Sequence, residues 1–166
     1  MQKHQPLQDK IQQILPMAAF NRWLDLQLVS AAPGEVTLHV PWRDEFGQYS
    51  GFLHAGILGA LIDTACGFAA ITQTDRVLAS QYTVRCLRPA VAETFVVRGW
   101  VVKPGRQQVF SAAEIYALGD ESRKLFAVGD AMCQPEKPRQ LHATRGFSVV
   151  VLSVRTPAPL GAARSR

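Results

Sequence analysis

The segment 51–74, GFLHAGILGALIDTACGFAAITQT, restricts the possible folds more than any other part of the chain. It is too long and too rich in Ala and Leu to be a strand, so we predict one long helix here. Asp63 is the only carboxylate between Glu45 and Asp75. The chain therefore places one acidic group in the middle of an otherwise apolar helix.

The predicted helix has two unlike faces when its residues are placed at about 100° per residue. One face carries a broad apolar stripe suited to covering a sheet, formed by Ile57, Leu58, Leu61, Ala65 and Phe68. The opposite face carries Asp63 among small residues, which are Gly56, Gly59, Ala60, Gly67 and Ala70. Glycine inside a helix costs roughly 1 kcal/mol relative to alanine. We therefore expect another backbone or a ligand to approach this face closely.

Asp63 leaves two interpretations open. Aspartate is unfavourable within a helix because its short side chain competes for backbone hydrogen bonds. Burying it unpaired would also be costly or would force it to take up a proton. The structural interpretation is an exposed side chain, or an ion pair with an arginine such as Arg85 or Arg98. The functional interpretation is a carboxylate in a cleft between two subunits, acting as a base or nucleophile.

Strand-like segments lie on both sides of the helix. Two segments precede it, at 23–28 and 36–40, with a polar loop at 43–52 between them and the helix. Four follow it, at 77–87, 94–102, 109–117 and 124–132, separated by short turns. This order favours an antiparallel sheet over alternating parallel units. We predict an α+β fold, with five to six antiparallel strands around one long central helix.

The two ends of the chain differ from the middle. Residues 1–19 predict a short, peripheral N-terminal helical segment with a break at Pro16. Residues 135–166 predict a basic, flexible tail in which 147–154 could add a strand, and the domain itself covers 20–134. All six charged residues after Glu136 are basic, and their summed charge exceeds the net charge of +5 for the whole chain. The domain is therefore nearly neutral, which argues against nucleic acid as a partner.

Three cysteines, Cys66, Cys86 and Cys133, are odd in number and lie in apolar segments. This pattern predicts reduced, buried thiols and a cytoplasmic protein rather than disulfides. We expect no signal peptide, membrane association or metal site, since the N-terminal segment has no long apolar run and the histidines lack ligand spacing. No Gly-x-Ser-x-Gly elbow, phosphate loop or dinucleotide fingerprint occurs, which disfavours a serine triad.

The helix start and the strand after it together resemble a known family. His54-Ala55-Gly56 opens the helix two turns before Asp63, and residues 82–89 read Tyr-Thr-Val-Arg-Cys-Leu-Arg-Pro. This arrangement resembles the hotdog-fold thioesterases of the phenylacetate-degradation type, whose helix begins His-Gly-Gly. The resemblance covers residues 20–133 and implies the hotdog fold.

The resemblance implies a role for each motif residue. Asp63 would activate water or attack the thioester carbonyl. The backbone N–H of Ala55 or Gly56 would donate to the carbonyl oxygen, since unpaired N–H groups at a helix N-terminus stabilise negative charge. His54 would shape the helix start more often than transfer a proton, and Gln48 would position water or the thioester.

One position departs from the pattern of some relatives, which carry a Ser or Thr on the strand after the helix, ten residues before the proline. Here that position is Ala79, with Ser80 beside it on the other face if the strand is regular. The departure removes a hydroxyl that could help to position the attacking water.

The implied function is hydrolysis of an acyl-CoA thioester to the free acid and CoA, without a metal or other cofactor. Candidates for binding CoA phosphates are Arg85, Arg88, Lys103 and Arg106. Candidates for lining the acyl pocket are Phe52, Leu53, Phe68 and Trp100. We expect a homodimer that pairs into a homotetramer, because the small-residue helix face needs a partner and the family shares its active site between chains.

Two other functions stay open at this point. A hydratase or dehydratase on the same fold would use His54 and Asp63 as an acid–base pair, although the two lie on nearly opposite sides of the helix. A non-catalytic acyl-CoA-binding sensor would keep the groove that binds the acyl-CoA, and it would not need Asp63.

Overall fold

The computed structural model describes residues 5–136, so the expected strand at 147–154 and nearly all of the expected tail at 135–166 lie outside the described residues. The elements in chain order are α1 (Gln5–Ile14), η1 (Leu15–Met17), α2 (Ala19–Trp23), β1 (Gln27–Ala32), β2 (Glu35–Pro41), η2 (Asp44–Phe46), α3 (Ala55–Ile71), β3 (Val77–Cys86), β4 (Thr94–Lys103), β5 (Val109–Ala117) and β6 (Ala127–Pro135).

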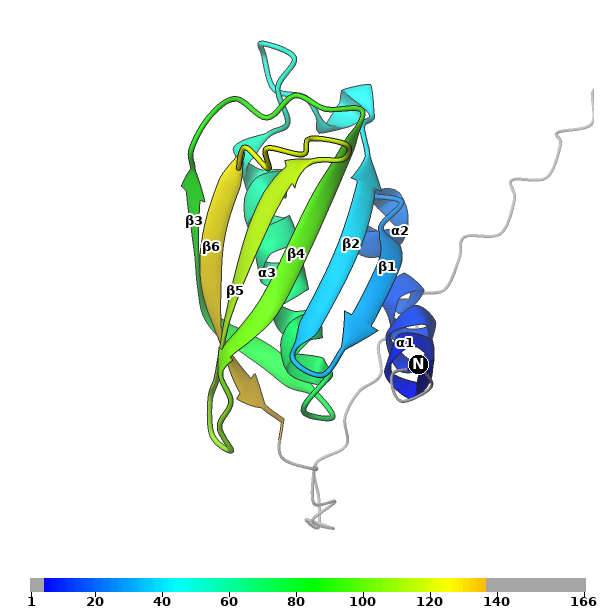
Figure 1. The fold of residues 1–166 in the computed structure, drawn as a ribbon, viewed down its shortest axis with the longest axis vertical. Coiled ribbons are helices and arrows are strands. Elements are labelled where there is room, and N and C mark those ends of the chain that lie inside the picture. The colour runs from blue at the N-terminus through cyan, green and yellow to red at the C-terminus, as the bar shows by residue number, and fades with distance from the viewer. Residues whose placement is uncertain (1–4, 137–166) are drawn as a thin grey trace, which may run out of the picture.

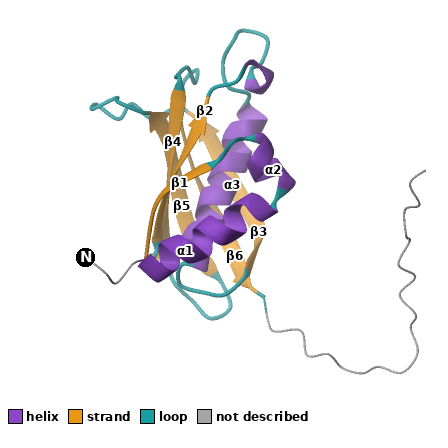
Figure 2. Ribbon diagram, turned by 90° about the vertical axis from the view of Figure 1, so that its right-hand side faces the viewer, coloured by secondary structure: helices purple, strands orange, loops and turns teal. Residues whose placement is uncertain are grey.

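The six strands form one antiparallel sheet in the order β1-β2-β4-β5-β6-β3 (Figure 1). β3 follows α3 directly and lies at the edge opposite β1, so α3 carries the chain from one side of the sheet to the other. The helices lie on one face of the sheet, with α3 against its centre (Figure 2). The predicted α+β class, with up to six antiparallel strands and one long helix, is confirmed.

Two strand positions differ from the prediction for local reasons. The first strand was expected at 23–28, but Trp23 ends α2 and β1 begins only at Gln27. Asp25 lies between them with a φ of 49°, which turns the chain. The last strand was expected at 124–132, but the Asp120 carboxylate accepts backbone hydrogen bonds from Ser122 and Lys124. This turn keeps the segment out of the sheet until Ala127.

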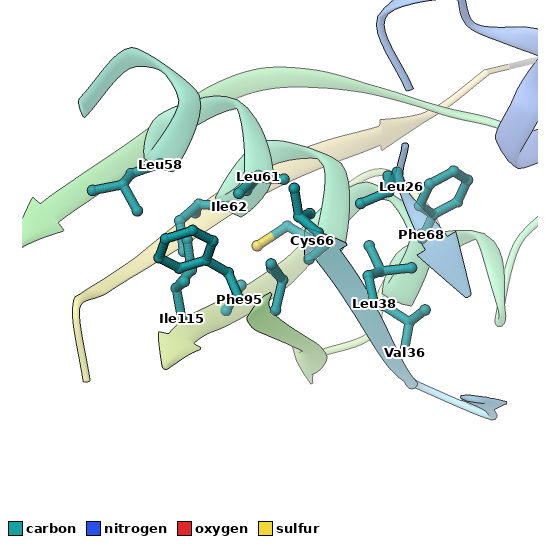
Figure 3. Packing of buried hydrophobic residues seen from close by; sticks show 14 of the residues in the cluster. Leu26, Val36, Leu38, Leu58, Leu61, Ile62, Cys66, Phe68, Phe95 and Ile115 are labelled. Carbon is teal, nitrogen blue, oxygen red and sulfur yellow. The ribbon is translucent and has the colours of Figure 1, made fainter. Parts of the chain in front are cut away.

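α3 packs very closely on the sheet. A Cβ atom added at Gly99 of β4 would stand 2.7 Å from the Ala65 carbonyl carbon, and one added at Gly129 of β6 would stand 2.7 Å from Ile62 Cγ2. Only glycine leaves room for the helix at these points. The apolar stripe predicted for α3 is buried against the sheet, as Leu58, Leu61 and Phe68 show in Figure 3.

The N-terminal segment is part of the core rather than peripheral. α1 ends at Ile14, before Pro16, as predicted, but Ile11 is fully buried and Leu15 is 4% exposed. Lys10 extends from α1 to the far end of α3, where its ammonium donates to the Ile71 and Thr74 carbonyl oxygens. A cation at a helix C-terminus is stabilising, so α1 and α3 hold each other in place.

The two edges of the sheet differ. At β1 the Gln8 side chain of α1 donates to the Val29 carbonyl oxygen and accepts from the Ala31 N–H, at 3.4 and 2.8 Å. These bonds satisfy backbone groups that would otherwise be open to another strand. At β3 most side chains are exposed, and within the described part of the chain no strand or side chain covers the outer edge. β3 is therefore the edge free to pair.

Candidate active site

The start of α3 is capped by His54, which precedes the first helical residue in an extended conformation. Its Nδ1 accepts a hydrogen bond of 2.9 Å from the Gly56 N–H. The Ala55 N–H has no hydrogen-bond partner among the described residues. The sequence did not decide between the Ala55 and Gly56 N–H groups as the donor to a substrate. In this part of the structure the Gly56 N–H is already hydrogen-bonded, whereas the Ala55 N–H is free at the positive end of the helix.

This cap determines what the His54 ring can do. A neutral imidazole has one N–H and one lone pair on its ring nitrogens. Since Nδ1 uses its lone pair to accept from Gly56, the hydrogen is on Nε2. His54 can therefore donate a hydrogen bond from Nε2 to a ligand, while the Nδ1 lone pair is engaged by the Gly56 N–H.

The loop before α3 folds back over the helix start. Its backbone bonds join Gln48 N–H to the Phe52 oxygen at 2.8 Å and His54 N–H to the Phe46 oxygen at 2.9 Å. Gly51 turns the loop with a φ of 72°, which favours glycine. The result is a cavity of about 410 Å³ that brings together Gln48, His54, Ala55 and Arg88 with the apolar Phe52, Leu53 and Leu58.

Asp63 lies two turns further along α3 and is not in this cavity. It is half-buried, and within the described residues it makes no hydrogen bond or ion pair. Arg85 pairs with Asp130 at 3.6 Å, while Arg98 lies between Glu35 and Glu114, at 3.5 and 3.7 Å. The interpretation of Asp63 as the partner of either arginine is therefore wrong. Burial removes water from the carboxylate and raises the pKa of Asp63 above 3.8.

The small-residue face of α3 meets the edge strand. Tyr82 and Val84 of β3 lie against Gly59, at 3.5 and 3.6 Å from the position of a Cβ atom there. A Cβ at Gly67 would meet nothing within 4 Å. The expected close approach of a backbone or ligand therefore occurs only in part, with side chains of β3 on Gly59 and open space at Gly67.

The four basic candidates do not form one cluster. Arg88 lines the cavity, but its guanidinium stacks on Phe126 at 4.7 Å and donates to the Lys124 oxygen. Arg85 holds Asp130. Lys103 and Arg106 belong to the β4–β5 hairpin, where Arg106 borders a second cavity with Gln73 and Thr74, just beyond the C-terminal end of α3. Within one chain, the hairpin residues and the helix start lie at opposite ends of α3 (Figure 1).

Other expectations have mixed outcomes. Phe52 and Leu53 line the cavity, whereas Phe68 is in the core and Trp100 packs beneath the Arg98 guanidinium at 5.5 Å.

β3 is not regular at Ala79, because its pairing with β6 shifts there and the Ser80 hydroxyl donates to the Met132 oxygen. Ser80 is thus already engaged with backbone.

The cysteines correct one expectation and add a cavity residue. Cys66 and Cys133 are buried, and burial raises the pKa of their thiols to about 12 and about 11. Cys86 was expected to be buried, but it is exposed and lines the cavity. Its position three residues before Pro89, at the end of the strand, is the sequence signal that could have indicated this.

Neither a metal centre nor a membrane span is found in residues 5–136. In that range no group of three or more side chains drawn from His, Cys, Asp and Glu is arranged to hold a metal ion. No helix in the same range is long and apolar enough to cross a membrane.

Comparison with known proteins identifies the family. The family model described as the thioesterase superfamily matches residues 50–124. A crystal structure of a thioesterase family protein from Silicibacter pomeroyi is 32% identical, with a TM-score of 0.73; the match covers 77% of this chain and 96% of that one. This chain belongs to the thioesterase superfamily. The hotdog thioesterase resemblance is thereby confirmed, and thioester hydrolysis is its general chemistry.

Two further comparisons concern a solved structure that shares the fold and a relative that matches part of the sequence. The PaaI protein from the phenylacetic acid degradation operon of E. coli shares the fold, with a TM-score of 0.72 at 21% identity over 79% of this chain and 94% of that protein. The protein SSO2140 of Saccharolobus solfataricus, whose name includes the word esterase, is 28% identical over 86 residues. That match spans 51% of this chain and 61% of the relative.

The cap geometry leads to a prediction about His54. His54→Asn keeps a good N-cap and should retain thermal stability and most thioester cleavage, whereas His54→Ala should lower the unfolding free energy by about 1 kcal/mol. Thermal melts and thiol-release rates on both variants check this. If His54→Asn abolished cleavage, the capping of α3 would be insufficient to explain the role of the ring.

Proposed function

We propose that this thioesterase hydrolyses acyl-CoA to the free acid and CoA, with Asp63 as the general base. The observation that carries the proposal is the unpaired, partly desolvated Asp63 carboxylate on a helix that begins with a free Ala55 N–H. A carboxylate without a partner lowers stability, and a function that uses it explains its presence. The cavity beside Ala55 gives a thioester access to the N–H.

One chain alone does not complete this site. Ala55 and Asp63 are eight residues apart on α3, or about 12 Å along the helix axis at 1.5 Å per residue. A thioester carbonyl must have its oxygen within hydrogen-bond distance of the donor while water attacks its carbon from the base. One substrate cannot reach both groups of the same helix. We infer that Asp63 works with the Ala55 N–H of a second copy.

The free β3 edge supports a homodimer that achieves this. Antiparallel pairing of two β3 strands would bring the two α3 helices side by side, running in opposite directions. A two-fold axis that places Asp63 of each copy beside Ala55 of the other passes midway between them, at the level of Gly59. Tyr82 and Val84 of β3 lie over Gly59, so the axis would meet β3 at Thr83.

The proposed reaction uses each group once. The thioester oxygen accepts a hydrogen bond from the Ala55 N–H, and the His54 Nε2–H and Gln48 amide are further donors in the same cavity. Asp63 takes a proton from water as the water oxygen attacks the carbonyl carbon. The tetrahedral intermediate then collapses, the C–S bond breaks, and CoA leaves as the thiolate, which takes up the proton held by Asp63 and restores the carboxylate. Asp63 as a nucleophile, forming an anhydride, is the second possibility on this site.

Binding of the CoA phosphates is proposed for Arg85, Arg88, Lys103 and Arg106. Since the hairpin residues are remote from the helix start in their own chain, they would serve the site only through the assembly, which we propose to be a dimer that pairs into a tetramer. A cytoplasmic location is proposed because the free thiols suit a reducing compartment. Nucleic acid and membranes are not among the proposed partners.

The two alternatives have less support. A hydratase needs a histidine able to exchange protons, and the His54 lone pair is occupied by the Gly56 N–H. A sensor has no use for the unpaired Asp63. Both alternatives would, however, leave CoA thioesters uncleaved, so the first experiment separates them from hydrolysis.

Asp63→Asn should lower kcat for acyl-CoA hydrolysis by about 10³-fold, because loss of a general base typically costs 10² to 10⁴. The measurement is thiol release from a panel of acyl-CoA esters, and a single turnover in water enriched in the heavy oxygen isotope shows whether label enters the protein. Heavy oxygen found in the Asp63 carboxylate would show that Asp63 acts as a nucleophile rather than as a general base. A wild-type protein that cleaved no ester, or a variant as active as wild type, would refute hydrolysis by Asp63.

The pH dependence of kcat/KM should show an acid limb. Catalysis requires the ionised carboxylate, and burial raises the pKa of Asp63 above 3.8, so activity is present above the raised pKa and is lost as the pH falls through it. The midpoint should therefore lie above 3.8. Rates across an acid-to-neutral pH series, corrected for unfolding, measure it, and a midpoint at or below 3.8 would contradict the proposal.

Thr83→Cys in a Cys86→Ser background should form a disulfide-linked dimer under mild oxidation, because residues on the axis of an antiparallel pair face their own copies. Leu78→Cys in the same background is the matched control, since its copies would be about 33 Å apart along the strand. Non-reducing electrophoresis and sedimentation check this. A dimer that cross-links at Leu78 and not at Thr83 would overturn the register.

A further inference from the structure

Tyr82 occupies the space between the two catalytic positions of α3. It comes from β3, and the tip of its ring lies on the helix surface at Gly59, with Cε2 3.5 Å and the hydroxyl oxygen 3.8 Å from the position of a Cβ there. Gly59 is four residues from Ala55 and four from Asp63. The absence of a side chain at Gly59 leaves this part of the helix surface to the phenol.

Helix geometry directs the Asp63 side chain toward the turn on which the Tyr82 hydroxyl lies. Cα–Cβ bonds in a helix tilt toward its N-terminus, so Asp63 extends over the turn that contains Gly59. Cβ positions four residues apart are about 6 Å from each other, which leaves both oxygens near this turn. Tyr82 is 49% exposed, and neither oxygen has a hydrogen-bond partner in the part of the chain that the structure describes.

The other hydroxyl groups of β3 are engaged elsewhere. Ser80 donates to the Met132 carbonyl oxygen at 3.0 Å, and Thr83 donates to the Asp130 carboxylate at 2.7 Å. Ala79, where some relatives have a hydroxyl, offers none. Tyr82 is thus the one described residue of this strand whose hydroxyl is available beside the helix.

We propose that Tyr82 is a positioning residue whose hydroxyl oxygen holds the attacking water against Asp63. The water donates one hydrogen to Tyr82 and the other to the Asp63 carboxylate. As its oxygen bonds to the carbonyl carbon, Asp63 takes the second hydrogen as a proton, while Tyr82 stays neutral and keeps its own. The proposal rests on the proposed hydrolysis and adds the group that orients its nucleophile.

The test is Tyr82→Phe, which keeps the ring on Gly59 and removes only the oxygen. We expect kcat for acyl-CoA hydrolysis to fall about tenfold, the effect of one lost hydrogen bond, with KM within about twofold and the melting temperature unchanged. Tyr116→Phe is the matched control, because that ring lies on β5 beneath Arg123 at 5.5 Å. It should leave both constants unchanged.

A double variant distinguishes positioning of water from a structural effect. If Tyr82 and Asp63 hold the same water, adding Tyr82→Phe to Asp63→Asn should change kcat by less than about twofold, whereas independent effects would multiply. An active wild type with an unchanged Tyr82→Phe variant, or multiplicative losses, would overturn the role of Tyr82 and leave hydrolysis intact. Hydrolysis itself fails only if wild type cleaves no ester, or if Asp63→Asn is as active as wild type.

Discussion

The contact between α3 and the inner face of the sheet determines where Ala55 and Asp63 lie. The helix backbone passes directly over Gly99, and the Ile62 side chain of the helix packs on Gly129, so no larger residue fits at either position. Lys10 of α1 donates hydrogen bonds to carbonyl oxygens at the C-terminal end of the helix. Interiors packed this closely resist small shifts. The Ala55 N–H therefore stays at the cavity, and the Asp63 carboxylate stays beside the edge strand. Neither position depends on a long loop.

At Asp63 this packing works against stability. Its helix buries apolar residues on nearly every side, and the same burial removes water from the carboxylate, which has no partner among residues 5–136. Structural carboxylates elsewhere in the domain have partners: Asp130 has Thr83 and Arg85, and Asp120 has its own turn. The contrast shows that the chain has the means to satisfy a carboxylate and does not use them at Asp63.

Much of the fold could be predicted because it depends on local patterns. The long helix follows from an apolar run that is too long for a strand, and most of the strands follow from the alternation of apolar and polar residues between turns. The starts of two strands were missed because a single residue decides each of them. Asp25 turns the chain before β1 through its backbone angle φ, and the Asp120 carboxylate holds a turn before β6. The exposure of Cys86 was also missed, although its place at the end of a strand, three residues before Pro89, could have indicated it.

The site was predictable in its residue types but not in its hydrogen bonds. Motif spacing indicated His54, Ala55, Gly56 and Asp63, yet the choice between two backbone donors depends on the orientation of one imidazole ring. Likewise, the partners of Arg85 and Arg98 depend on strand register. Arg85 lies near Asp130 only because β3 pairs with β6, its neighbour across the sheet rather than along the chain.

The unequal treatment of the two sheet edges connects assembly to chemistry. Gln8 satisfies the β1 edge with two hydrogen bonds, while β3 keeps an open edge beside the small-residue face of α3. An exposed edge is a liability for a monomer, and so is an unpaired carboxylate. Antiparallel pairing at β3 would close the open strand edge. It would also place the Asp63 carboxylate of each copy beside the Ala55 N–H of the other, which lies too far away within one chain. The same contact would then stabilise the sheet and create two equivalent sites.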